Sequence, residues 1–462
     1  MEKIRSALYR FFYGKNREIE PPKHSELIQI PEENYSQPIP LEDEEYYHGF
    51  LLEKEVNSIF QSVEEGYFII RRAQSIDGLK YILSVKGEDK LYNCLINQTN
   101  KRKLHWIDVH AFKTIQQMVA YYRKTNVSFR VWDPQYADEA ELHLTAPIKR
   151  FKWQLNHEQI EIDCYLSEGT FGEVFKGYLE VSFSEGRKLV AVKKLKEENL
   201  TSAEMLELLR EGDHMKRFNH RNVVKFFGIA SSTTPFMIAI EFCAGDSLYG
   251  FIRKRPTTDF QKVRFLYHAS LGICYLHDLG FVHGDIAARN CLLTQDLVLK
   301  ISDFGLSSDQ AGAKRKGTIL PMRYMSPEAL ESFLITKESD AYAFSALIYE
   351  VFHRGHEPFS EYEPRGLVGE ALKKEKVKLY LFKRPKKSKL PIGMQVDITS
   401  WYLSLDLPEI PPIQLEMEIL FKHTRFRNVQ YRAIYSKHCD QNNQRSIVGT
   451  LERLMKKYNI KN

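Results

Sequence analysis

The spacing of hydrophobic and polar positions divides the chain into stretches with different predicted structure. Residues 46–140 follow a pattern of helix, strands and helix, which suits one small domain. Its predicted elements are a helix at Glu53–Phe60, strands at Gly66–Arg71, Lys80–Val85 and Leu91–Asn97, and a second helix at Thr114–Tyr122. From Trp153 the pattern is first rich in strands and then, beyond about residue 245, rich in helices.

The two segments that flank this small domain have less regular patterns. Residues 1–45 are predicted to be a leader and linker, with a basic, aromatic stretch at Arg5–Arg17 and a stretch rich in Pro and Glu at Pro21–Glu45. Helical spacing in the first stretch is compatible with contact at a membrane surface. We favour a frayed leader or a segment docked on a neighbouring domain. Residues 141–155 are predicted to be a second linker.

Length and composition indicate a folded protein of several domains. The chain has 462 residues, of which 43% are hydrophobic and 27% are charged, and these values exclude wholesale disorder. No apolar run is long enough to span a membrane, and the first residues lack the apolar core of a signal peptide. The six cysteines show no zinc or disulfide spacing, so we expect reduced thiols in a cytosolic protein. The predicted location is cytoplasmic, with peripheral contact at the plasma membrane as an open alternative.

The net charge of +6 comes from one segment. Lys373–Lys389 holds nine Lys or Arg and one acid, a charge of +8, so the rest of the chain sums to −2. This distribution is no argument for specific nucleic-acid binding. A solvated flank of an inserted loop is the favoured interpretation of the basic segment, while a nuclear address, an anionic-membrane contact and a dock for acidic substrates stay open.

The first domain carries a candidate phosphate site at Arg71. An arginine at the end of an apolar strand needs a partner if it points inward, and its planar guanidinium suits a phosphate. Together with Tyr46–Gly49, the following helix and the strands Gly66–Arg71 and Tyr81–Val85, it resembles an SH2 domain, the phosphotyrosine-binding module. The resemblance implies that Arg71 grips phosphotyrosine, and a role in docking on the kinase stays open as the alternative. Three positions depart from the family pattern, namely Glu53, Ala73 and Asn93.

The second domain begins with a candidate nucleotide loop. Leu166–Val174 is rich in turns, and its small residues would let backbone N–H groups approach phosphates. An apolar strand ends at Lys193, and a buried lysine needs an acidic partner, which Glu211 in the helical run Glu204–Arg217 would supply.

Three further motifs follow in order, His283–Asn290, Lys300–Gly305 and Met325–Glu328, and together with the loop and Lys193 they resemble a protein kinase. The resemblance implies that Asp285 accepts the proton of the substrate hydroxyl beside Arg289, and that Glu211 orients Lys193 on the ATP phosphates. It implies a site for Mg²⁺ or Mn²⁺ at Asn290 and Asp303. Asp340 would brace the catalytic loop. The implied nucleotide contacts are Ser167, Gly169, Gly172, Val174, Ala191, Lys193, Glu241 and Cys243.

Two features resemble tyrosine kinases in particular. Ala287–Arg289 has their catalytic-loop form, and Leu320–Met325 resembles their substrate ledge, with Tyr324 in place of the usual Trp. An SH2 domain directly before such a kinase, with the junction Phe151–Ile160, is most similar to the cytoplasmic Fes/Fer family. This resemblance implies protein substrates with tyrosine and phosphotyrosine-containing partners. That family usually carries a long membrane-binding region upstream, so this chain would be a truncated member.

The predicted fold is therefore α+β: an SH2 domain at 46–140, with a central antiparallel sheet flanked by two helices, and a bilobal kinase domain at 156–455. Two features depart from the kinase pattern. Gly284 replaces the Arg that meets an activation-loop phosphotyrosine, and no tyrosine lies between Asp303 and Arg323. We hypothesise that activity does not require that phosphorylation. An insertion is predicted at about 380–425, and an incorrectly joined coding segment is its alternative. A pseudokinase scaffold and a serine/threonine kinase are the alternative functions.

Overall fold

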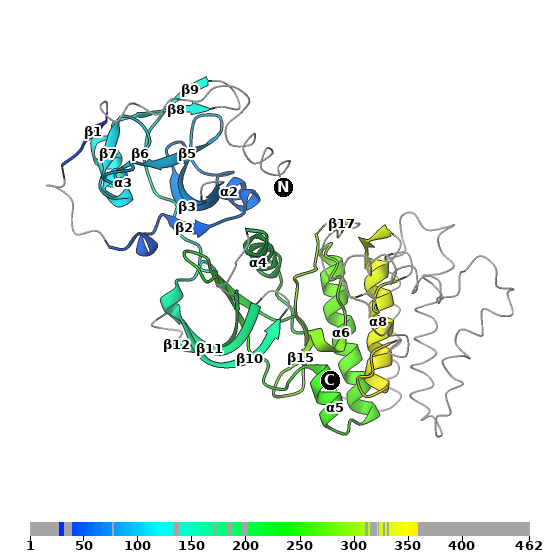
Figure 1. The fold of residues 1–462 in the computed structure, drawn as a ribbon. Helices are drawn as coiled ribbons and strands as arrows, with labels where there is room; N and C mark the ends of the chain where they lie inside the picture. The colour runs from blue at the N-terminus through cyan, green and yellow to red at the C-terminus, as the bar shows by residue number, and fades with distance from the viewer. Residues whose placement is uncertain are drawn as a thin grey trace. The chain divides into compact units, whose positions relative to one another are not determined.

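The computed structural model describes most of residues 27–358 (Figure 1). The gaps in that description are 32–38, 76–77, 134–137, 170–171, 183–185, 196–201, 310–312, 315–320, 322, 327–328 and 330–331. The predicted insertion, the basic segment Lys373–Lys389, the stretch Arg5–Arg17 and most of the predicted kinase domain beyond residue 358 lie outside the described residues. The chain forms two compact units, Met1–Gly212 with Phe227–Ala239, and Asp213–Phe226 with Ile240–Asn462.

The first unit begins with a seven-stranded sheet in the order β1-β7-β6-β5-β4-β3-β2. Its strands are β1 (Ile28–Gln29), β2 (Tyr47–Phe50), β3 (Phe68–Ser75), β4 (Gly78–Lys86), β5 (Leu91–Gln98), β6 (His105–Trp106) and β7 (His110–Phe112). The pairs β1·β7 and β2·β3 are parallel and the others are antiparallel. A short turn of 3-10 helix, η1 (Leu41–Asp43), precedes β2, and the hairpin β8 (Phe129–Asp133) and β9 (Asp138–Leu142) follows the sheet.

Two helices cover opposite faces of this sheet. Successive strand residues point to opposite faces. On β3, Ile70 packs in one core cluster with α3 (Ile115–Thr125), and its neighbour Ile69 packs in another with α2 (Glu53–Ile59). The predicted sheet flanked by two helices is therefore confirmed, and both predicted helices are present.

The two predicted linkers differ from their expected form where the structure describes them. Within the leader, Ile28 and Ile30 donate backbone hydrogen bonds to Val109 and Ala111, so β1 extends the sheet as an edge strand. In the segment 141–155, Ile148 N–H donates to Phe68 O at 2.9 Å and Leu155 is buried in the core of the next sheet. Backbone pairing and burial, rather than side-chain pattern, hold both segments.

The first unit continues with a five-stranded sheet in the order β10-β11-β12-β14-β13. Its elements are η2 (His157–Gln159), β10 (Ile160–Gly169), β11 (Gly172–Ser182), β12 (Gly186–Leu195), α4 (Ser202–Met215), β13 (Phe226–Ala230) and β14 (Met237–Glu241). Val190 and Val192 point from β12 into its core. This is the predicted strand-rich start of the second domain.

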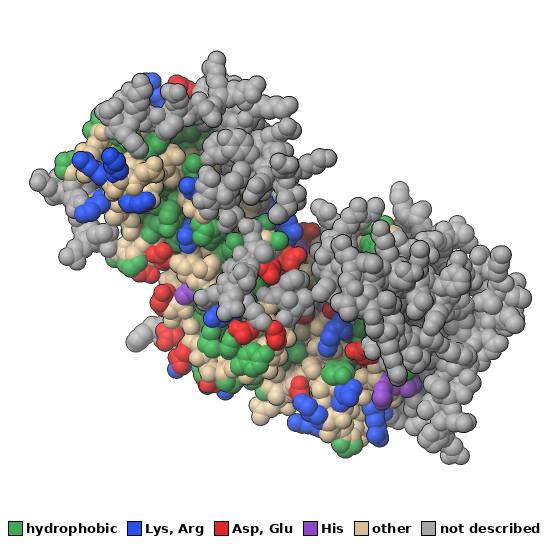
Figure 2. Space-filling model, viewed as in Figure 1, with side chains coloured by type: hydrophobic (Ala, Val, Ile, Leu, Met, Phe, Trp, Pro, Cys, Tyr) green, Lys and Arg blue, Asp and Glu red, His purple; other side chains and the backbone are tan. Residues whose placement is uncertain are grey.

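The second unit is built around two long helices that lie side by side in Figure 1, α6 (Asp259–Asp278) and α8 (Lys337–Phe352). Its other elements are α5 (Leu248–Lys254), η3 (Ala288–Asn290), β15 (Cys291–Leu293), β16 (Leu299–Ile301), β17 (Ala313–Lys314) and β18 (Leu334–Ile335). The side chain of Thr258 caps α6 by accepting a hydrogen bond from the backbone N–H of Gln261. The side chain of Thr336 caps α8 in the same way, accepting from the N–H of Ser339. Both helices contribute to one large apolar core, so the loops around η3 rest on a rigid base. Figure 2 shows Lys and Arg together with Asp and Glu on the described part of the visible face.

Candidate active site

Lys193 and Glu211 meet as predicted, within the first unit. Lys193 Nζ lies 2.6 Å from Glu211 Oε2, with 13% of the lysine side chain and 6% of the glutamate side chain exposed. The lysine comes from β12 and the glutamate from α4. A buried ammonium is costly unless it is paired, so this contact fixes both the strand and the helix. The arrangement presents one cation at the end of an apolar strand beside Ala191, which is buried.

The candidate nucleotide loop forms the hairpin of β10 and β11. Ser167 pairs with Val174 and Gly169 pairs with Gly172, while the tip at residues 170–171 lies outside the described residues. A Cβ at Gly172 would lie 2.3 Å from Lys194 O on β12. The close approach of β11 to β12 therefore requires glycine at this position.

Asp285 lies between two donors in the second unit. Arg289 Nη2 is 2.5 Å from Asp285 Oδ1, and Asn290 Nδ2 donates to Asp285 Oδ2 at 2.7 Å. Burial opposes the charge of Arg289, but Asp285 and Tyr324 outweigh it and the pKa of Arg289 is raised. The donors hold Asp285 as an oriented carboxylate, which is the form needed to accept a proton.

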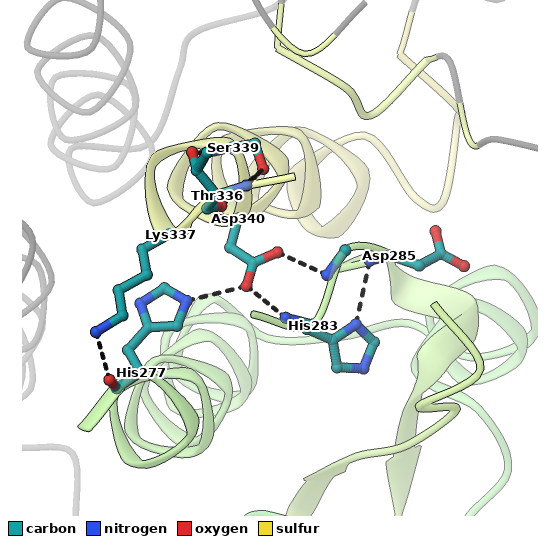
Figure 3. Close-up of polar contacts among 8 residues, drawn as sticks. His277, His283, Asp285, Thr336, Lys337, Ser339 and Asp340 are labelled. Atoms are coloured by element: carbon teal, nitrogen blue, oxygen red, sulfur yellow. Dashed lines mark hydrogen bonds and ion pairs between the residues drawn. The ribbon is translucent and has the colours of Figure 1, made fainter. Parts of the chain in front are cut away.

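Asp340 on α8 braces the loop that carries Asp285, as the sequence predicted (Figure 3). Its Oδ2 accepts from His277 Nε2 at 2.9 Å and from the backbone N–H of His283 at 2.8 Å, and its Oδ1 accepts from the N–H of Gly284 at 2.8 Å. His283 Nε2 lies 3.0 Å from Ser302 O, and its Nδ1 accepts from the N–H of Asp285. The buried carboxylate thus fixes two consecutive residues of the loop, and the His283 ring fixes the third, Asp285.

Gly284 has a backbone φ of +82°, in the left-handed region that favours glycine. A Cβ there would lie 2.9 Å from Leu306 O and 3.2 Å from Ile335 Cδ1. Glycine at this position, where the kinase pattern has Arg, therefore avoids the backbone strain and the close contact that a side chain would cause.

The candidate metal ligands Asn290 and Asp303 offer oxygen atoms. Both amide hydrogens of Asn290 face Asp285, since Nδ2 donates to its backbone O and to its Oδ2, which leaves Asn290 Oδ1 as an acceptor. Asp303 is exposed and has a φ of +62°. Amide and carboxylate oxygens are the ligands that Mg²⁺ prefers, so the two residues fit that ion. Within the described ranges, no three His, Cys, Asp or Glu residues cluster as a metal site of their own.

The other two predicted nucleotide contacts, Glu241 and Cys243, lie in the second unit. The Glu241 carboxylate is 3.0 Å from Lys300 Nζ and accepts from the N–H of Lys225. Burial raises the pKa of Cys243 to about 12, so its thiol stays protonated near neutral pH. The Glu241 carboxylate is thus committed to an ion pair, and its backbone N–H donates to Lys225 O at 2.8 Å.

Arg71, the candidate phosphate-binding residue of the first domain, is buried. Its Nε donates to Ser84 Oγ at 2.9 Å and its Nη2 donates to Asn93 Oδ1 at 3.1 Å. Burial lowers its pKa to about 10, and Glu53 opposes that shift, so the guanidinium stays charged. Arg71 is thus a fixed cation whose hydrogen-bond partners, Ser84 and Asn93, are neutral, which suits an anionic ligand.

Two functional residues were missed by sequence reasoning. Ser84, fully buried on β4, supports Arg71, and the sequence feature that could have revealed it is a hydroxyl within the otherwise apolar run Tyr81–Val85. Glu350, on α8, accepts from Ala288 N–H at 2.8 Å and from the Tyr324 hydroxyl at 3.0 Å. The sequence feature that could have revealed Glu350 is an acidic residue within the apolar run Ala341–Val351.

Searched over its described residues, the chain has no helix that is both long and apolar enough to cross a membrane. Comparison with protein families gives two matches. The SH2 domain family matches residues 46–122, and the family described as protein tyrosine and serine/threonine kinase matches residues 160–388. The matches are consistent with the two sheets and with the ion pair of Lys193 and Glu211.

Among curated proteins, the chain is 37% identical to spermatocyte protein spe-8 of Caenorhabditis briggsae over 358 residues, which are 77% of this chain and 66% of that protein. It therefore spans just under two thirds of that relative. It is 31% identical to Fer-related kinase 1 of Caenorhabditis elegans, covering 68% of this chain and 78% of that protein. It is 28% identical to human tyrosine-protein kinase Fer, covering 86% of this chain and 45% of that protein. With an SH2 domain followed by a tyrosine-kinase-type domain, the chain belongs to the Fes/Fer family of protein kinases.

Proposed function

We propose that this chain transfers the γ-phosphate of ATP to tyrosine in protein substrates. The observation that carries the proposal is the buried ion pair of Lys193 and Glu211 at 2.6 Å, because the pairing fixes the lysine side chain in place to hold phosphates. The proposed kinase domain is 156–455, following the proposed SH2 domain at 46–140.

Asp285 is the proposed proton acceptor. Arg289 and Asn290 hold its carboxylate, so it can receive the proton of a tyrosine hydroxyl while the phenol oxygen bonds the γ-phosphorus and ADP leaves. Asn290 and Asp303 would hold Mg²⁺ or Mn²⁺, which supplies neutralising charge to the phosphate oxygens. The proposed nucleotide contacts are Ser167, Gly169, Gly172, Val174, Ala191, Lys193, Glu241 and Cys243.

The proposed role of the SH2 domain is to bind phosphotyrosine at Arg71 and to dock on the strand-rich part of the kinase domain. Docking is supported by three hydrogen bonds within the first unit. Phe50 N–H donates to Ser231 O, Ser231 Oγ donates to Phe50 O, and the Tyr47 hydroxyl donates to Ser232 O, at 2.9–3.1 Å. A phosphopeptide titration that shows no affinity advantage over the unphosphorylated peptide would leave docking as the sole role.

The proposed partners are tyrosine-containing substrates and phosphotyrosine proteins, and the proposed location is cytoplasmic. The predicted leader and the basic segment Lys373–Lys389 are the proposed sites of contact with the plasma membrane surface. Binding to liposomes containing phosphatidylserine, compared with neutral liposomes, would test it.

The test is transfer from radiolabelled ATP with Mg²⁺ to a Glu-Tyr polymer, followed by phosphoamino-acid analysis. We expect phosphotyrosine from the wild-type chain and at least about a hundredfold less from Lys193→Met. Phosphoserine or phosphothreonine on a mixed protein substrate would favour the serine/threonine alternative, and equal background from both proteins would favour the scaffold.

A further inference from the structure

Tyr324 stands where the resembling family has Trp, and its surroundings in the second unit are specific to a phenol. The side chain is 4% exposed, and its hydroxyl donates to Glu350 Oε1 at 3.0 Å. Its ring faces Arg289, with the guanidinium carbon 4.8 Å from the ring centroid. One side chain therefore makes a polar contact at its tip and a cation–π contact at its face.

Glu350 connects this tyrosine to the catalytic loop. The side chain is 1% exposed, and its second oxygen accepts the N–H of Ala288, the residue before Arg289. Burial raises the pKa of Glu350 to about 7, while Ala288, Tyr324 and Arg289 favour its anion. The negative charge of Glu357 disfavours that anion and so also raises the pKa of Glu350. A buried carboxylate is retained only when donors satisfy it, so loss of the Tyr324 hydroxyl would weaken the anion and its hold on the loop.

Arg289 carries the effect to Asp285. It contacts the ring of Tyr324 on one side and donates to Asp285 Oδ1 on the other. The contacts form a continuous path from Tyr324 through Arg289 to the proposed base Asp285, and Glu350 on α8 holds both Tyr324 and the backbone of Ala288.

We infer that Tyr324 is a positioning residue for phosphoryl transfer, and that it links the predicted substrate ledge to the pair Arg289–Asp285 through its ring and through Glu350. The inference rests on the proposed function. It assigns a task to the phenol, because the hydroxyl at the ring tip reaches a buried carboxylate on α8.

The test is a double-mutant cycle with Tyr324→Phe and Glu350→Gln in the full chain, using steady-state kinetics on a tyrosine peptide. Tyr324→Phe keeps the ring over Arg289 and removes one hydrogen bond to a charged group, so we expect kcat to fall about tenfold. The KM for ATP should change by less than about twofold, because Lys193 and the nucleotide loop are untouched. The double variant should lose little more than either single variant.

Tyr122→Phe is the matched control, because Tyr122 is fully buried on α3 and its hydroxyl has no hydrogen-bond partner among the described residues. It should leave kcat unchanged. Unfolding midpoints of all variants separate a loss of positioning from a loss of folded protein. A wild-type kcat in Tyr324→Phe, purely additive effects in the cycle, or a fall in kcat that follows the folded fraction would overturn the inference while the proposed function stands. An inactive wild-type chain would overturn both.

Discussion

At the scale of single residues, the site consists of buried charges that each meet a specific partner. Lys193 has Glu211, Asp285 has Arg289, and Asp340 accepts three hydrogen bonds. Burial without partners would cost several kcal/mol per charge, so these pairs determine the local geometry as well as the chemistry.

Gly284 gives the first prediction at this scale. Gly284→Ala should lower the free energy of unfolding by about 2 kcal/mol, because a left-handed φ and a close contact with Leu306 O both oppose the new Cβ. Gly280→Ala is the control: its φ is +84° and a Cβ there would meet nothing within 4 Å, so it should cost only about 1 kcal/mol. Urea unfolding measures both. Equal losses would show that the contact at Gly284 is unimportant.

His48 gives a pH prediction. It is buried, its Nε2 lies 2.9 Å from Ile148 O, and burial lowers its pKa to about 4. Since the unfolded chain takes up this proton near pH 6.5 and the folded chain does not, stability is complete above pH 6.5 and falls as the pH is lowered toward 4.

The expected loss from His48 between pH 6.5 and pH 5 is about 2 kcal/mol in the free energy of unfolding. His48→Gln keeps a donor for Ile148 O but does not titrate, so its urea midpoint should depend less on pH over that interval. The same pH dependence in both proteins would contradict the assignment.

At the scale of elements, sequence pattern predicted the regular, half-buried segments well. The helix expected at Glu53–Phe60 is α2, and the strand expected at Leu91–Asn97 is β5. Pattern did not predict β1, since two residues at a sheet edge have no periodicity of their own and are held by backbone bonds to Val109 and Ala111. Catalytic motifs predicted Asp285 and Asp340, but not Glu350, because its contacts with Ala288 and Tyr324 depend on tertiary packing.

The edge between β2 and the β13–β14 connection gives a prediction for this scale. Phe50 packs against Phe236 with ring centroids 4.9 Å apart, and both side chains are buried. Phe50→Ala should destabilise the first unit by about 3 kcal/mol and speed amide exchange at residues 231–236. Phe151→Ala, at a ring that is 40% exposed, should change little. Unchanged exchange at 231–236 in Phe50→Ala would exclude Phe50 as the anchor.

At the scale of the molecule, the SH2 domain and the strand-rich part of the kinase domain belong to one compact unit, and α5, α6 and α8 belong to another. The predicted linker, 141–155, lies along β3 and enters the core of the second sheet. The binding module is therefore built into the kinase framework rather than tethered to it.

The most direct test of the central claim is the initial rate of phosphotyrosine formation on a Glu-Tyr polymer, for the wild-type chain and for Asp285→Asn at equal concentration. Asn keeps the size and the acceptor oxygen but cannot take the proton, so we expect a rate at least about a hundredfold lower than that of the wild type. Equal rates for the two proteins, or no phosphotyrosine from the wild type, would contradict the assignment of this chain as an active tyrosine kinase.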